Sequence, residues 1–168
     1  MNLFNTFFAD QCSLINNASV LPPFEYKVNS NIHNISFTEN EIISIIRSLN
    51  YNKAHSWEGI SIRMVKICDD SIALPLKMIF DTALKSGCYP EKWKKANGIP
   101  VHKKDSKNIL KNYRPISLLP ICGKIFEKCI FNTLYSYFES NDILSKHQSG
   151  FRKGDSCISQ LLGNLFLF

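Results

Sequence analysis

The sequence "NYRPISLLPICGKIFEK", residues 112–128, passes from a strand pattern to a helix pattern. In its first half Ile116 and Leu118 alternate with a serine, and a proline holds Arg114 extended, so residues 113–118 are predicted to form a strand. None of the eight residues after Arg114 carries a charge. The arginine therefore has no charged partner among these eight residues.

The neighbouring segments complete a strand pair and a helix. Residues 99–103 form a second candidate strand, and the polar turn at 105–108 lets the two strands run antiparallel as a basic ribbon. Pro120 stands where a helix accepts proline in its first turn, and apolar residues recur after it at helical spacing as far as Phe138. The sequence therefore predicts a ribbon joined directly to a long helix that ends near residues 139–142.

Further helices are predicted outside this region, and the fold class is therefore α+β and mainly helical. Thr38 and Glu41 have the spacing of a capping box, and isoleucines follow with a 3.6-residue period, which predicts a helix over residues 39–49. The other predicted features are a short helix carrying Leu3, Phe4, Phe7 and Phe8, a connector at 16–34, a helix after Ser61, a helix capped by Ser71 and stopped by Gly87, a helical turn with Trp93, and a last helix capped by Ser156.

The composition is that of a globular protein. A chain of 168 residues, 45% hydrophobic and 12% aromatic, suffices for one domain or most of one. Its net charge of +6 favours a polyanionic partner, with nucleic acid before an anionic membrane surface. Six scattered cysteines without a C-x-x-C pair favour reduced thiols over a disulfide scaffold. We predict an intracellular location, cytoplasmic or nuclear, with no signal peptide and no transmembrane segment.

A complete active site is missing from the sequence. The adjacent carboxylates of Asp69 and Asp70 lie between two predicted helices, where helix termination and capping explain them better than metal binding does. The histidines and cysteines have no zinc-ligand spacing. We therefore predict no catalytic residue and no metal ligand in these residues.

Cations gather instead in loops and extended segments. A guanidinium binds phosphate bidentately, an ammonium adds a point charge, and nearby glycines let backbone N–H groups approach an anion. Tyr113 and Phe151 each adjoin an arginine and offer faces for stacking. The alternative is a solvated basic surface with no ligand. The cations of the ribbon are Lys103, Lys104, Lys107, Lys111 and Arg114, and those of a second loop are Lys146, Arg152 and Lys153.

Four motifs in order resemble the fingers-side, N-terminal part of the reverse transcriptases of non-LTR (LINE-type) retrotransposons, especially jockey and RTE-like elements. The resemblance covers nearly the whole chain, to about Leu162. The motifs are "NKAHSWEGIS" (52–61), "WKKANGIPVHKK" (93–104), "NYRPISLLPICGKIFEK" (112–128) and "HQSGFRKGDSCISQLL" (147–162). Such enzymes are RNA-directed DNA polymerases, nucleotidyltransferases encoded by transposable elements. The resemblance implies a partial right-hand polymerase fold, with fingers helices and a short antiparallel ribbon.

The resemblance also implies roles for the loop and ribbon residues. Lys103 and Arg114 match the fingers cations that grip the triphosphate of the incoming dNTP. The residues implied to contact the template or other nucleic acid are Gln148, Gly150, Phe151, Arg152 and Lys104. The complete family enzyme also binds an RNA template and uses Mg²⁺, which the aspartates of its palm hold.

Two departures from the family pattern affect what we expect of the turn at residues 56–59 and of the activity. Ser56-Trp57-Glu58-Gly59 stands where the family commonly has Gly-Pro-Asp-Gly, which leaves the geometry of that turn open. Both aspartate motifs of the palm are missing from the sequence. We therefore expect a fragment without its palm, inactive alone and without a cofactor.

The expected domain organisation has three parts. Residues 1–37 are expected to form a linker with one short helix, residues 38–162 the fingers and the start of the palm, and residues 163–168 a truncated or out-of-frame tail. Two alternatives remain open for the function: a retained RNA- or nucleotide-binding module, and a pseudogene product without a selected function.

Overall fold

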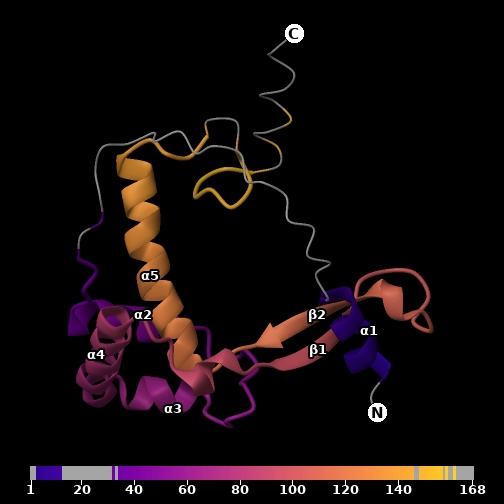
Figure 1. The fold of residues 1–168 in the computed structure, drawn as a ribbon, viewed down its shortest axis with the longest axis horizontal. Coiled ribbons are helices and arrows are strands. Elements are labelled where there is room, and N and C mark those ends of the chain that lie inside the picture. Colours follow the sequence, from indigo (N-terminus) through magenta and orange to yellow (C-terminus); the bar gives the residue numbers. More distant parts are fainter. Residues whose placement is uncertain are drawn as a thin grey trace. The chain divides into compact units, whose positions relative to one another are not determined.

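The computed structural model describes residues 3–12, 32, 34–145, 148–156, 158 and 161. The chain divides into two compact units, one of Met1–Pro23 with Asn34–Phe131 and one of Phe24–His33 with Asn132–Phe168. Most of the predicted connector and last helix, and the whole predicted tail at 163–168, lie outside the described residues. The elements in chain order (Figure 1) are α1 (Leu3–Cys12), α2 (Glu39–Ser48), α3 (Ile62–Ile67), α4 (Asp69–Ser86), η1 (Glu91–Lys94), β1 (Asn97–His102), η2 (Leu110–Asn112), β2 (Tyr113–Leu118) and α5 (Ile121–Ser140).

The part of the chain that the structure describes is mainly helical with one two-stranded antiparallel sheet, which agrees with the predicted α+β class. The short N-terminal helix and the helical turn at Trp93 are present as α1 and η1. The first strand begins at Asn97 and ends at His102, so the prediction of 99–103 was two residues late at its start and one residue late at its end. The second strand has the predicted bounds.

The start of α2 confirms the predicted capping box. The Thr38 hydroxyl oxygen accepts a hydrogen bond from the Glu41 N–H at 3.2 Å, and the Glu41 carboxylate accepts one from the Thr38 N–H at 2.7 Å. These bonds satisfy backbone donors that have no partner within the helix. The helix then buries Ile42, Ile45 and Ile46, as its period predicted.

The next two helices confirm one predicted cap and correct another. The Ser61 hydroxyl accepts from the Met64 N–H and begins α3 as predicted. However, α4 begins at Asp69, so the predicted N-cap at Ser71 was wrong, and Asp69 and Asp70 lie in the first helical turn rather than between helices. Acidic groups are favourable there because they face the positive end of the helix dipole. Gly87 ends α4 with a φ of 66°, as its position predicted.

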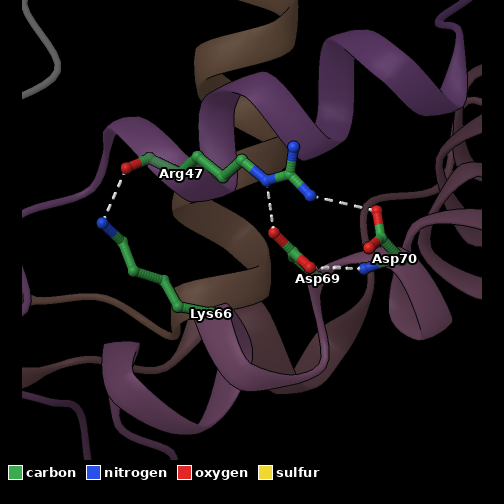
Figure 2. A network of polar contacts seen from close by, with 4 residues as sticks. All are labelled: Arg47, Lys66, Asp69 and Asp70. Atoms are coloured by element: carbon green, nitrogen blue, oxygen red, sulfur yellow. Dashed lines mark hydrogen bonds and ion pairs between the residues drawn. The ribbon is translucent and has the colours of Figure 1, made fainter.

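Arg47 connects the last turn of α2 to the first turn of α4 (Figure 2). Its Nε donates to a carboxylate oxygen of Asp69 at 2.5 Å, and its second guanidinium nitrogen lies 3.2 Å from Asp70. The Lys66 ammonium donates to the Arg47 carbonyl at 2.6 Å, which places a cation at the negative end of α2. The hydrogen bond and charge of Arg47 lower the pKa of Asp69 from its ordinary value of 3.8.

Replacing Asp69 with asparagine is expected to make the protein less stable at pH 7 and to leave its stability unchanged in acid. Because the pKa of Asp69 is lower in the folded state, its ionised carboxylate stabilises the fold at pH values above 3.8, its pKa in the unfolded chain. This contribution is lost as the pH falls through the lowered pKa of the folded state. The effect is expected to be small because the Arg47 side chain is 60% exposed. Urea unfolding at pH 7 and at a pH well below 3.8 measures it.

Asp70 supplies the matched control for this substitution. Its side chain is 75% exposed, against 14% for Asp69, and its contact with Arg47 is longer. Asp70→Asn should therefore cost less stability at pH 7. An equal loss from both substitutions would contradict the assignment of Asp69 as the principal partner of Arg47.

The core of the first unit lies between α2, α4 and the beginning of α5, around a group of aromatic rings. Phe80 of α4 and Phe126 of α5 stack with their centroids 4.7 Å apart. Trp93 and Tyr89 close this group, each with its ring about 6 Å from that of Phe126. Gly123 permits the approach, because a Cβ there would lie 3.0 Å from the Tyr89 hydroxyl and 3.3 Å from the Trp93 Cβ.

Candidate nucleotide and nucleic-acid interface

The ribbon brings the two predicted nucleotide-binding residues to the same face. In the register of β1 and β2, Val101 lies opposite Arg114, and the Lys103 N–H extends the pairing by donating to the Asn112 carbonyl at 2.8 Å. Opposed residues share a face, and side chains alternate along a strand. Lys103, two residues beyond Val101, therefore lies on the Arg114 face as its diagonal neighbour, although it follows the last residue of β1.

Both cations are exposed and lack a partner for their side-chain charge. Within the part of the chain that the structure describes, neither the Lys103 ammonium nor the Arg114 guanidinium has a hydrogen bond or an ion pair. Three residues on the same face are apolar and also exposed: Ile99 is 41%, Val101 47% and Ile116 45% exposed. The face thus combines two free cations with an uncovered apolar surface.

The opposite face of the ribbon contacts α1 at Tyr113. The Tyr113 ring packs edge-on against Phe4 of this helix at 4.9 Å and against His102 at 5.2 Å. Its hydroxyl donates to the Lys107 carbonyl at 3.0 Å. Tyr113 is therefore a structural residue here, and these contacts occupy the ring that the sequence suggested for stacking on a base.

The loop between the strands is ordered by its own polar contacts. The Asn112 amide donates to the Ser106 carbonyl at 2.8 Å, and a ring nitrogen of His102 lies 3.0 Å from the Asp105 carbonyl. Asp105 has a φ of 63°, a conformation that aspartate tolerates better than most residues. These contacts fix the backbone, and they leave the predicted contact residue Lys104 exposed together with Lys107 and Lys111.

The remaining predicted contact residues lie in the second unit, where Arg152 fixes the loop after α5. Its guanidinium donates to the Ser145 carbonyl at 3.1 Å and pairs with Glu139 at 3.1 Å. The Gln148 amide donates to the Gly150 carbonyl at 3.2 Å. Arg152 is thus already bound to a carboxylate, unlike Lys103 and Arg114. Lys146 lies outside the described residues.

Phe151 adopts an uncommon conformation in this loop. It has a φ of 63°, which is rare for a bulky side chain, and its side chain is fully exposed. A large ring held in solvent by a left-handed backbone gains nothing from burial in this structure. Its predicted contact with nucleic acid stays a prediction.

The turn that departs from the family pattern makes a contact that the sequence did not reveal. The Gly59 N–H donates to the Ser56 carbonyl at 3.2 Å, and Gly59 has a φ of 72°, so the turn uses the glycine that matches the family. Glu58 accepts a hydrogen bond from the Ile121 N–H, the first residue of α5. An acid before this glycine was a visible signal, but its partner 63 positions later was not.

No group of three or more His, Cys, Asp or Glu side chains among the described residues could hold a metal ion. Asp69 and Asp70 both face Arg47, so they do not fit the paired Mg²⁺ ions of a polymerase site. The same part of the chain contains no helix that is both long and apolar enough to cross a membrane. An apolar groove of about 360 Å³ along α4, lined by residues such as Met78, Ile79 and Pro90, includes none of the predicted site residues.

Similar curated proteins are polymerases of mobile elements, although no model of a known protein family matches the chain. The RNA-directed DNA polymerase from the mobile element jockey of Drosophila melanogaster is 34% identical over 116 residues, which are 68% of this chain and 13% of that protein. The probable RNA-directed DNA polymerase from transposon BS of Drosophila melanogaster is 32% identical over 72% of this chain and 14% of its own length. The jockey polymerase of Drosophila funebris is 28% identical over 87% of this chain and 16% of its own length.

The chain therefore spans less than a sixth of the length of these relatives. Their names agree with the family that the four motifs resemble. Over most of its length the chain is therefore similar to one segment of the RNA-directed DNA polymerases of non-LTR retrotransposons.

Proposed function

We propose that this chain is the fingers fragment of an RNA-directed DNA polymerase, and that its ribbon binds the triphosphate of a dNTP through Lys103 and Arg114. The observation that carries the proposal is the placement of these two cations on one uncovered face without a partner for either charge in the described residues. The surrounding fragment is proposed to be a partial right-hand polymerase fold.

The chemistry of the two side chains suits a triphosphate. The planar guanidinium of Arg114 can donate two parallel hydrogen bonds to phosphate oxygens, while the Lys103 ammonium supplies a point charge. The exposed apolar residues next to them offer a surface for the sugar or base of the same ligand. Exposed Lys104 lies one residue beyond Lys103, where a template phosphate is proposed to contact it.

Binding is proposed without catalysis by these 168 residues alone. Phosphoryl transfer in this family requires carboxylates that hold two Mg²⁺ ions, and the described carboxylates do not form such a group. The complete enzyme is proposed to bind RNA template, dNTP and Mg²⁺, whereas this fragment is proposed to keep the dNTP and template contacts only. An intracellular location follows from this role and is part of the proposal.

Purified chain is expected to bind dTTP saturably, with a Kd at or below about 1 mM at low salt, and to bind thymidine much more weakly. Both cations act on the phosphates, so the nucleoside lacks the group they recognise. Equilibrium dialysis with labelled ligands measures the two affinities. The same preparation, given an RNA template, a DNA primer, dNTPs and Mg²⁺, is expected not to extend the primer.

Two results would contradict the proposal. Equal affinity for dTTP and thymidine would show that the phosphates are not recognised. Template-dependent primer extension above background would show that the fragment is not inactive alone. Tight, salt-dependent binding of single-stranded RNA without binding of dTTP would favour the alternative of an RNA-binding module.

A further inference from the structure

The turn at residues 56–59 is fixed on the first residue of α5. The Glu58 carboxylate accepts the Ile121 N–H at 3.2 Å across a separation of 63 residues, in a partly buried position. The turn itself is held by the bond from Gly59 to Ser56, and Ser56 is only 3% exposed. A buried serine and a closed turn leave the carboxylate little freedom to move away from the helix.

A carboxylate at this position can accept a hydrogen bond from a backbone N–H at the start of α5. The Lys124 N–H is bonded to the Pro120 carbonyl, so the N–H groups of the preceding helical residues have no acceptor within α5. Glu58 accepts one of them and places a negative charge at the positive end of the helix dipole. The pKa of the Cys122 thiol is raised by burial first and by the Glu58 charge second, which agrees with a carboxylate close to this helix start.

The start of α5 in turn determines where β2 leaves the core. Only residues 119 and 120 separate the last residue of β2, Leu118, from Ile121. Pro120 and Ile121 are fully buried, and the proline ring fixes its own backbone torsion. The direction of β2, and with it the position of Arg114, therefore depends on where the first turn of α5 is fixed.

We infer that Glu58 is a positioning residue for the anion site on the ribbon: by capping α5 it holds β2, and hence Arg114, in the orientation that binds the triphosphate. The inference rests on the proposed dTTP binding. Glu58 itself contacts no ligand, and as an anion it would repel one.

Two measurements on the same variants test the inference. We expect Glu58→Ala to weaken dTTP binding about fivefold and to speed amide hydrogen exchange at Ile121 by a similar factor, because an N-cap of ordinary strength is lost. Glu58→Asp and Glu58→Gln, which keep an acceptor, should restore slower exchange and most of the dTTP affinity. Glu39→Ala is the control, since it removes the same charge from the first turn of α2 and should change neither measurement.

The outcomes separate this inference from the proposed function. Faster exchange at Ile121 in Glu58→Ala with unchanged dTTP affinity would confirm the cap and overturn the positioning role. Unchanged exchange would overturn the cap itself. Absence of dTTP binding by the unsubstituted chain would overturn the proposed function, and the positioning role with it, whatever the exchange shows. If Glu58→Ala does not fold, Glu58→Asp decides, because it keeps the charge and shortens the reach to the Ile121 N–H: faster exchange at Ile121 with weaker dTTP binding would support the positioning role, and faster exchange with unchanged binding would overturn it.

Discussion

Replacing Phe126 with alanine is expected to lower the free energy of unfolding by about 3–5 kcal/mol, a large part of the stability of a domain of this size. Phe126 is 3% exposed and stacks on Phe80 at 4.7 Å. Its ring also contacts those of Tyr89, Trp93 and Phe37, with centroids 5.9–6.3 Å away. Four rings from three other segments would then face one cavity, which rigid aromatic side chains cannot refill.

Urea unfolding followed by tryptophan fluorescence measures this loss, since Trp93 lies in the affected cluster. Phe131→Ala is the control from the same helix, because Phe131 is 49% exposed and its ring contacts Lys128 at the surface. We expect the control to cost about 1 kcal/mol or less. A Phe126→Ala protein as stable as this control would show that the aromatic cluster is not the centre of the fold.

Much of the local structure could be predicted because short-range chemistry determines it. The Thr38 capping box, the Ser61 cap and the Gly87 stop each depend on residues within a few positions of one another. The bounds of β2 likewise follow from one alternation pattern and one proline. In each case a backbone donor or a left-handed position is satisfied by a neighbour in the sequence.

The errors and omissions involve partners that are distant in the sequence. Asp69 begins α4 two residues before the predicted cap, and its partner Arg47 lies 22 positions earlier. The sequence offers Tyr113 for stacking, but its ring packs against Phe4, more than 100 positions away in the sequence. Glu58 caps a helix 63 positions later. Periodicity and capping rules contain no information about such contacts, because tertiary packing determines them.

Replacing both Lys103 and Arg114 with alanine is expected to weaken dTTP binding by about 100-fold or more. Hydrogen bonds to charged groups contribute about 1.5–3 kcal/mol each, and this variant removes both cations that share the uncovered ribbon face. The fold should be unaffected, since neither side chain has a hydrogen bond or ion pair in the described residues. Equilibrium dialysis measures the affinity, and circular dichroism checks the fold.

Net charge is the confounding factor in this experiment, and the chain offers a matched control. Lys92→Ala with Lys95→Ala removes the same two charges from exposed positions in and after η1, on the same unit. If the face recognises phosphate by geometry, this control should lower dTTP affinity by about twofold or less, through the general loss of positive potential. Arg114→Lys then separates shape from charge, because an ammonium cannot replace the two parallel donors of a guanidinium. Equal losses in the two double variants would mean that dTTP is held by the overall charge of +6 rather than by a site on the ribbon.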